Sequence, residues 1–339
     1  MREIADGLYY AEISGDDGPE ELFRVGVDGE KALGAYVRER LSGAPAGTEQ
    51  PGQDGGIGFG CSTITAKNDA GEVLFGRNLD WARSSALILV NTPTAGGAFP
   101  SVSTVNPEVM RYCGIGHPED LPEEDLARAA LYFPLDGMNA CGFALSVNMI
   151  KDATAEAQRT APGKTPLNFT SAIRLLLDRA TSVKDAVRLL GEYDLCIPGG
   201  GQLFHFAMAD KSGESVTVEF IGGKIYVTET PAVTNFYLTP NAVSGTDKYG
   251  IGTDQSVERY KTLLSKLADA PHAPDGTPRL SADDVRDALA SVAKSNFNVP
   301  GASTEWSIVF RLAACTATYY RREAWSSPFT CSIPANSML

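Results

Sequence analysis

The sequence predicts a layered α+β fold with antiparallel sheets. Strand patterns come in runs and helix patterns come in pairs, whereas a doubly wound parallel fold needs strand and helix to alternate strictly. Four short strand patterns follow one another over residues 203–236, and two helix patterns follow one another over 170–190. With 339 residues, of which 43% are hydrophobic, the chain can bury a substantial core without disulfides.

The first 60 residues differ in composition from the rest. A short strand pattern at Leu8–Tyr10 and an amphipathic helix pattern over 30–41 come first. Residues 42–60, SGAPAGTEQPGQDGGIGFG, follow with seven glycines and two prolines. This composition is typical of a flexible linker. We therefore expect a pro-segment at 1–60 with a linker at 42–60, followed by one domain at 61–339.

The elements after the linker can be placed from periodicity. CSTITA alternates like a half-buried strand, 68–71 forms a turn, and a returning strand begins at Val73, so a hairpin is expected here. The remaining predicted strands are 86–90, 142–149 (entered through a turn at 136–139), 203–209, 215–220, 224–228, 232–236, 306–312 and 316–320. The remaining predicted helices are 170–180, 182–190, 256–267 and 281–294.

Charge and composition exclude several classes of partner. There are 29 Lys and Arg against 42 Asp and Glu, and the resulting net charge of −13 argues against a nucleic-acid partner. Three histidines make a His-rich metal site unexpected. No apolar run is long enough to span a membrane, and no signal peptide is visible. We expect a cytoplasmic protein, or an extracytoplasmic one if an N-terminal anchor has been removed.

Cys61 stands directly after the linker and at the start of a strand. A free cysteine in such a place is usually a small buried hydrophobe. If the Gly60–Cys61 bond is cleaved, however, the new α-amine of Cys61 lies beside its own thiol and can act as its general base. Arg77 and Asp80, in FGRNLDW on the returning strand, could stabilise the thiolate and orient the amine.

Strand geometry restricts that arrangement. Arg77 and Asp80 point to opposite sides of a regular strand, so a bend or bulge near Asn78 would be needed to bring both to one thiol. The alternative is that the two residues form an ordinary buried ion pair.

Several segments together resemble the choloylglycine hydrolase family of N-terminal nucleophile hydrolases, which includes bile salt hydrolases, penicillin V acylases and relatives of acid ceramidase. The segments are CSTITAKNDAGEVLFGRNLDW, DGMNACGFALSVNM, HFAMADKSGESVTVEF with PAVTNFYL, TDQSVERY, and the closing TEWSIVFRL with TATYYRRE. They occur in the family's order over about residues 57–330.

The resemblance implies an αββα sandwich of two antiparallel sheets and hydrolysis of linear amide C–N bonds without a cofactor. It implies that Cys61 is the nucleophile, that the Asn148 backbone N–H and the Asn235 side-chain amide hold the oxyanion, and that Arg259 belongs to the active site. Asn148 and Asn235 could instead cap turns, and Arg259, on a predicted helix, could be a surface charge.

Two departures from the family bear on the substrate. Many bile salt hydrolases carry the nucleophile directly after the initiator Met, whereas 60 residues precede Cys61 here. Ala140 also stands where relatives often have Glu. The expected activity is therefore a self-processing cysteine amidase that acts on an apolar acyl group joined to a small amine or amino acid. Bile salt hydrolase or penicillin V acylase activity proper, and an uncleaved ligand-binding homologue, are the alternatives.

The other reactive side chains are predicted to be structural. We expect His205, between two phenylalanines, to be a satisfied core histidine. The five remaining cysteines show no CxxC spacing and are expected to be structural thiols. A small-molecule amide is the expected ligand, and a homo-oligomer is possible.

Overall fold

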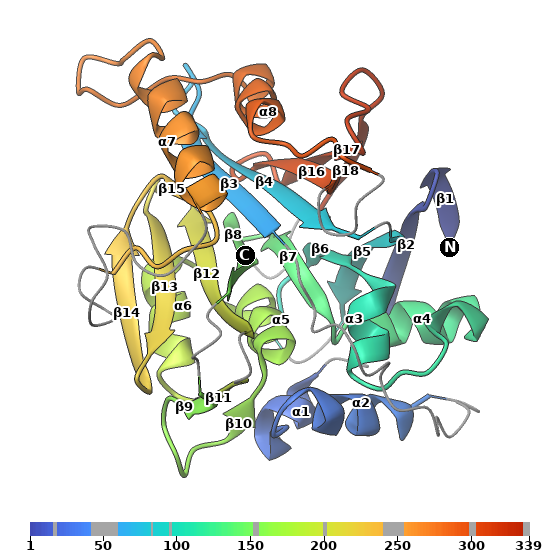
Figure 1. The fold of residues 1–339 in the computed structure, drawn as a ribbon. Coiled ribbons are helices and arrows are strands. Elements are labelled where there is room, and N and C mark those ends of the chain that lie inside the picture. The colour runs from blue at the N-terminus through green and yellow to red at the C-terminus, as the bar shows by residue number, and fades with distance from the viewer. Residues whose placement is uncertain are drawn as a thin grey trace.

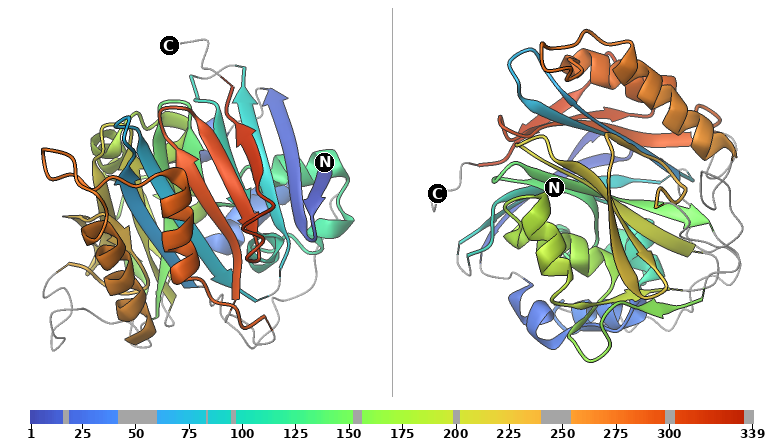
Figure 2. Two further views of the ribbon diagram at one scale, coloured as in Figure 1. Left: turned by 90° about the horizontal axis from the view of Figure 1, so that it is seen from above. Right: turned by 90° about the vertical axis from the view of Figure 1, so that its left-hand side faces the viewer.

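The computed structural model of the chain has four layers: helices, a six-stranded sheet, a nine-stranded sheet, and helices again (Figures 1 and 2). It describes residues 1–15, 19–41, 60–82, 84–94, 97–151, 156–198, 202–239, 254–297 and 303–334. The layer order confirms the αββα sandwich. Apart from Gly60, the predicted linker at 42–60 lies outside the described residues.

The six-stranded sheet carries the predicted hairpin. Its strands, in spatial order, are β15 (Ala232–Val233), β3 (Gly60–Lys67), β4 (Val73–Trp81), β16 (Ser303–Arg311), β17 (Thr316–Arg321) and β18 (Phe329–Ser332). The predicted hairpin of 61–66 with the strand from Val73 is β3 and β4.

The nine-stranded sheet faces it across the core. Its strands, in spatial order, are β1 (Arg2–Ala5), β2 (Leu8–Gly15), β5 (Ala86–Pro93), β6 (Ser101–Val105), β7 (Pro134–Asn139), β8 (Phe143–Lys151), β12 (Gln202–Asp210), β13 (Ser215–Ile221) and β14 (Lys224–Glu229). A small third sheet has the order β10 (Pro166–Leu167), β11 (Asp194–Ile197), β9 (Gln158–Arg159).

Helices cover the outer face of each sheet. Over the six-stranded sheet lie α7 (Asp254–Ala268) and α8 (Ala282–Ser291). On the other side of the nine-stranded sheet lie α1 (Glu20–Val25), α2 (Glu30–Arg38), α3 (Pro107–Tyr112), a 3-10 turn (Pro118–Asp120), α4 (Glu123–Ala130), α5 (Phe169–Arg179) and α6 (Val183–Leu190). Ile64 and Leu74 pack with α7 and α8 in one apolar cluster, while Leu79 belongs to the larger cluster between the sheets.

Two sequence expectations are corrected. The nine-stranded sheet is not wholly antiparallel, because β2 pairs with β5 in parallel. The predicted turn at 136–139 is part of strand β7, which pairs with β6 and β8. Asp-Gly is typical of a turn, but Gly137 is needed here for close packing: a Cβ on it would lie 2.5 Å from the Val102 carbonyl oxygen.

The N-terminal segment is built into the main fold. β2 pairs with β5 from Leu8 to Gly15. Leu22 and Phe23 of α1 and Leu33 and Val37 of α2 are buried in the same core as the sheets. Each such side chain contributes about 1.5–3 kcal/mol when it leaves water, so β2, α1 and α2 are firmly attached to the domain.

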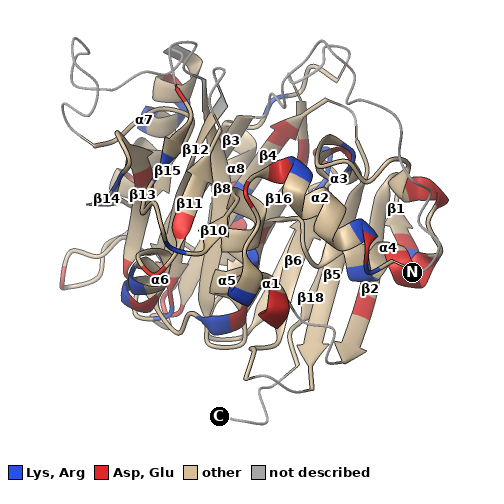
Figure 3. Cartoon of the chain, turned by 90° about the horizontal axis from the view of Figure 1, so that it is seen from below, with Lys and Arg blue, Asp and Glu red and all other residues tan. Residues whose placement is uncertain are grey.

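The surface shows charges of both signs. On α1, α2 and α4 acidic residues occupy the first turn and basic residues the last, so the two signs lie side by side on the helical face (Figure 3). This order matches the helix dipole. No helix among the described residues is long and apolar enough to cross a membrane.

Candidate active site

Cys61 lies at the second position of β3 with its side chain fully buried between the sheets. Its Sγ is 3.5 Å from the carbonyl oxygen of Val147 on β8. Its backbone N–H donates to Asn235 Oδ1 at 2.7 Å, and its backbone oxygen accepts from Arg259 Nη1 at 3.0 Å. The atom that would become the α-amine is therefore already held by a polar partner.

Arg77 and Asp80 lie on opposite faces of β4. The β3–β4 register is unbroken, with Gly60 opposite Asp80 and Thr63 opposite Arg77. A shift occurs only where β4 meets β16, between Thr304 and Trp306. The bend near Asn78 is therefore not what brings these residues to Cys61. Arg77 approaches from the inner face of the strand, together with Leu79, and Asp80 lies on the outer face, beneath the helices.

On the inner face, Arg77 links strand β4 to the nine-stranded sheet. Its Nε is 2.6 Å from Asp136 Oδ2, and its Nη1 donates to the Val147 carbonyl at 3.0 Å and to Asn148 Oδ1 at 3.2 Å. Arg77, Asp136 and Asn148 are fully buried. The alternative of an Arg77–Asp80 ion pair is wrong, since the carboxylate that pairs with Arg77 is Asp136.

On the outer face, Asp80 sits between two cations. Its Oδ2 is 3.0 Å from Arg259 Nη1 and 3.4 Å from Lys294 Nζ, while Oδ1 accepts from Thr304 Oγ1 at 2.7 Å. A Cβ on Gly60 would lie 2.6 Å from Asp80 Oδ2 and 3.0 Å from Lys294 Nζ. Only glycine fits at position 60 without moving this network, because these distances are shorter than van der Waals contact.

Arg259 and Asn235 close the site on the third side. Arg259 Nη2 donates to Asn235 Oδ1 at 2.7 Å, and Asn235 Nδ2 donates to the Met149 carbonyl at 2.6 Å. Arg259 is 7% exposed, so the reading of it as a surface charge is wrong. An amide nitrogen has two hydrogens, so Asn235 Nδ2 keeps one for a further acceptor.

Asn148 has an unused donor next to Arg77. Its Oδ1 accepts from Arg77 and from Ser146 Oγ. Among the described residues, Asn148 Nδ2 and Arg77 Nη2 are buried without a hydrogen-bond partner. Buried unpaired donors are costly, and an incoming anionic oxygen or a thiolate would satisfy them.

The structure thus brings together Cys61, Arg77, Asp80, Asn148, Asn235 and Arg259, while the roles given to them remain proposals. Sequence reasoning missed Asp136, Lys294 and Thr304. Asp136 was missed because Asp-Gly is typical of a turn, so the residue was not expected on a strand that faces Arg77. The other two follow α8 and begin β16, and no local pattern marks them.

Burial raises the pKa of the Cys61 thiol to about 11. Arg77 and Arg259 act in the opposite direction, and Asp80 adds to the increase. With Gly60 still attached, the thiol is therefore protonated at neutral pH. Ionisation of this thiol at neutral pH therefore needs a nearby base or a less buried setting.

This pKa predicts how Cys61 reacts with iodoacetamide. In uncut chains about one thiol in a thousand would be ionised at pH 8, and this fraction rises about tenfold per pH unit up to about pH 10. After alkylation of the native protein, trypsin releases Cys61 in peptide 41–67 from uncut chains and in peptide 61–67 from cut chains. We expect little label in the first peptide at pH 8 and more at pH 10. Rapid labelling of the uncut peptide at pH 7 would contradict the raised pKa.

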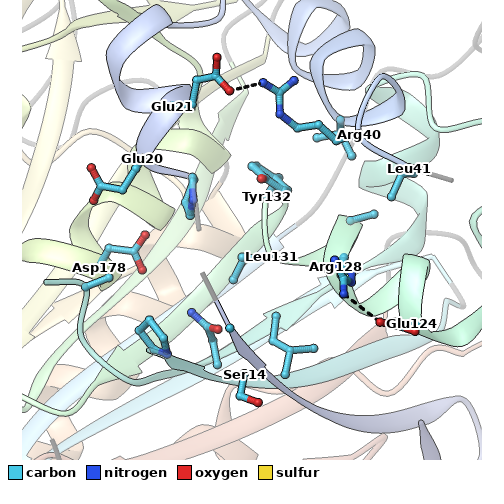
Figure 4. Close-up of a pocket in the computed structure, with 18 of the residues that line it drawn as sticks. Ser14, Glu20, Glu21, Arg40, Leu41, Glu124, Arg128, Leu131, Tyr132 and Asp178 are labelled. Atoms are coloured by element: carbon cyan, nitrogen blue, oxygen red, sulfur yellow. Dashed lines mark hydrogen bonds and ion pairs between the residues drawn. The ribbon is translucent and has the colours of Figure 1, made fainter. Parts of the chain in front are cut away.

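A separate pocket lies near the N-terminal segment. It has a volume of about 730 Å³ and is lined by residues of β2, α1, α2 and α4, with the ion pairs Arg40–Glu21 and Arg128–Glu124 at its rim (Figure 4). Leu131 and Tyr132 line it, but none of the predicted site residues does. This pocket is therefore not the one that serves Cys61.

His205 and the remaining cysteines are the reactive groups that the sequence predicts to be structural. His205 is buried and hydrogen-bonded, as expected of a core histidine. All six cysteines are free thiols. Within the described ranges, no group of three or more His, Cys, Asp or Glu residues is placed to hold a metal ion.

Comparison with known proteins identifies the family. The family model described as acyl-coenzyme A:6-aminopenicillanic acid acyl-transferase matches residues 133–323, more than half of the chain. The chain belongs to this family. The match spans Asn148, Asn235 and Arg259 but begins after Cys61, Arg77 and Asp80, so the nucleophile rests on the sequence pattern and the geometry. No curated protein matches the chain in sequence.

Solved structures agree on the fold. Two variants of the conjugated bile acid hydrolase from Clostridium perfringens superpose with a TM-score of 0.54, at 14% and 13% identity, over 80% of this chain and 92% of theirs. Penicillin V acylase from Agrobacterium tumefaciens has a TM-score of 0.49 at 17% identity, over 77% of this chain and 83% of its own. The two bile acid hydrolase structures show that this member of the acyl-transferase family has the N-terminal nucleophile hydrolase fold.

Proposed function

We propose that this protein is a self-processing cysteine amidase that hydrolyses linear amides of an apolar acyl group with a small amine or amino acid. The observation that carries the proposal is the setting of Cys61. Its thiol lies 3.5 Å from the Val147 carbonyl oxygen that Arg77 also binds, and its backbone nitrogen donates to Asn235.

Self-cleavage would come first. The Cys61 thiol attacks the carbonyl carbon of Gly60 and forms a thioester as the Gly60–Cys61 C–N bond breaks. The thiol proton ends on the nitrogen of Cys61, which becomes a free amine. Water then hydrolyses the thioester, leaving a carboxylate on Gly60 and a free thiol on Cys61.

Turnover would reuse the same atoms. The new α-amine has a reference pKa of about 7.7–8.0 and takes the thiol proton as the thiolate attacks the substrate carbonyl. The family resemblance implies the Asn148 backbone N–H as one oxyanion donor, but alternation along β8 turns the backbone groups of Val147 and Met149, not that of Asn148, toward Cys61. The Met149 N–H and the remaining Nδ2 hydrogen of Asn235 would therefore stabilise the oxyanion, each by about 3–4 kcal/mol if it acts as in serine proteases. The amine product leaves with a proton, and water releases the acid.

We further propose that residues 1–60 remain bound after the cut. The pairing of β2 with β5 and the buried apolar side chains of α1 and α2 support this, because cleavage at Gly60 breaks none of those contacts. The mature protein would be two fragments of one folded unit. Size-exclusion chromatography followed by mass spectrometry tests this: separation of the fragments without denaturant would refute it.

The decisive experiment combines intact mass with an amide panel. Purified wild type should yield fragments of 1–60 and 61–339 and should hydrolyse at least one of the N-acyl amino acids, acyl ethanolamides, conjugated bile acids or penicillin V. An uncut protein that hydrolyses none would favour the ligand-binding alternative.

Acyl transfer is a second candidate, because the matching family model describes an acyl-transferase. The same thioester can be attacked by an amine instead of water. Adding a small amine acceptor to the panel separates the two. Formation of a new amide in preference to the free acid would indicate transferase activity.

A Gly60→Ala substitution should slow self-cleavage. The added methyl group would press against Asp80 Oδ2 and Lys294 Nζ, so the network that holds Arg259 must shift. Since a displacement of about 1 Å can cost ~100-fold in rate, the uncut chain should accumulate on that scale, as measured by mass over time. Gly116→Ala is the control, because nothing lies within 4 Å of its added Cβ, its φ is not positive, and it lies in the loop between α3 and the 3-10 turn. Normal cleavage of Gly60→Ala would show that the close contact has no role.

A further inference from the structure

A row of polar side chains crosses the inner face of the nine-stranded sheet. Asn148 on β8 lies opposite His205 on β12, which lies opposite Glu219 on β13. Directly opposed residues of antiparallel strands project from the same face. All three are fully buried, and the mechanism above uses none of these three side chains.

His205 contacts the segment that carries Asn235. Its Nε2 is 2.8 Å from the carbonyl oxygen of Thr234, the residue before Asn235. A carbonyl only accepts, so Nε2 carries the hydrogen. The other ring nitrogen, Nδ1, lies 3.3 Å from Glu219 Oε1 and 3.3 Å from Thr217 Oγ1.

Glu219 contacts the same segment at its other end. Its Oε1 accepts from the Leu238 N–H and its Oε2 from the Thr239 N–H, each at 2.7 Å. Burial alone would raise the pKa of Glu219, but the bonds from His205, Thr239 and Leu238 outweigh it and lower the pKa. The carboxylate is therefore ionised and is a strong acceptor for both backbone groups.

We propose that His205 and Glu219 form a positioning clamp: their hydrogen bonds hold the backbone of segment 234–239 at both ends and so fix Asn235 against Cys61. The clamp rests on the proposed function for its catalytic meaning. Asn235 binds the Cys61 nitrogen, Arg259 and Met149, so a shift of its backbone would misplace the future amine and the oxyanion donor together. Thr234 Oγ1 also donates to the Ser256 carbonyl at 2.8 Å, which ties the segment to α7.

Paired variants test the clamp. His205→Leu removes the donor to Thr234, whereas His205→Gln keeps an amide donor. Glu219→Gln leaves one oxygen to accept from two backbone amides. In folded His205→Leu and Glu219→Gln proteins we expect self-cleavage and kcat to fall about 100-fold with KM changed less than threefold. His205→Gln should recover most of the rate.

Hydrogen exchange gives a readout that does not need activity. Peptides covering 234–239 should exchange faster in His205→Leu and Glu219→Gln than in wild type, even if wild type neither cleaves nor hydrolyses amides. That result would support the clamp while the proposed function fails. Unchanged exchange in this segment would overturn the clamp.

Asp178→Asn is the matched control, because Asp178 is a buried carboxylate paired with Arg174 on α5, away from Cys61. It should lower stability without a specific loss of kcat. An equal loss of kcat in Asp178→Asn at equal stability would overturn the clamp, since the effect would then be general. Glu219→Gln keeps the test valid if His205→Leu does not fold, because it breaks the contacts at the other end of the same segment.

Discussion

Replacing Cys61 with alanine should leave a single uncut chain of about 36 kDa and abolish amide hydrolysis. The substitution removes the only atom proposed to form the thioester, both with Gly60 and with substrate. Loss of the nucleophile in subtilisin lowers kcat by about 10⁶-fold, and we expect a loss of that order. The side chain is small and buried, so the fold should remain.

The measurement is intact mass together with the rate on the best amide of the panel. Cys331→Ala is the matched control, since Cys331 is another buried thiol whose pKa burial raises to about 12, but it lies on β18. It should cleave and turn over normally. Fragments of 1–60 and 61–339 in Cys61→Ala would mean that another protease makes the cut, and residual hydrolysis at the wild-type rate would remove Cys61 from the mechanism.

The hairpin that carries Cys61, Arg77 and Asp80 could be predicted from the sequence because it depends on strand periodicity. Alternation along 61–66 and 73–81 predicts the β3–β4 hairpin and puts Arg77 and Asp80 on opposite faces, which is what the register shows. The error was to assume that both must reach the thiol. A terminal nucleophile has two reactive groups, a side chain on one face and an amine at the strand end, and a different partner can serve each.

The outer half could not be predicted, because its partners come from distant parts of the chain. Lys294 and Thr304 reach Asp80 from the segments after α8 and at the start of β16. Asn235 and Arg259 were found through the family resemblance and not through their own spacing. The clamp left a visible signal, a buried polar residue inside each of two apolar strand patterns, LFHFAM and VTVEF, but the sequence alone gave no partner for either.

The N-terminal segment shows a different limit of prediction from the sequence. The sequence predicts a pro-segment at 1–60 and leaves open whether it stays bound, and buried residues of β2, α1 and α2 belong to the main core. A parallel pairing such as β2 with β5 joins residues far apart in sequence. Local patterns contain no information about such a partner.

Replacing Arg259 with methionine should have the largest combined effect on stability and processing. Arg259 is buried and binds Asp80, Asn235 and the Cys61 backbone oxygen. Methionine fills part of the volume but leaves the buried Asp80 carboxylate with Lys294 as its remaining cation. Breaking a buried ion pair in this way costs about 3–5 kcal/mol, and the retained lysine should keep the loss near the lower end. Denaturant unfolding measures it.

Two further variants separate charge from position. Arg174→Met breaks the buried pair with Asp178, which lies on α5 away from Cys61, so it should lose similar stability but still cleave at Gly60. In the double variant Arg259→Met with Asp80→Asn, the carboxylate that had lost its main cation is gone, and Lys294, whose side chain is 17% exposed, can be solvated. Stability should therefore recover, whereas self-cleavage should stay slow, because neither Asn235 nor the Cys61 backbone regains its guanidinium partner. Recovery of both stability and cleavage would mean that Arg259 serves only to neutralise Asp80.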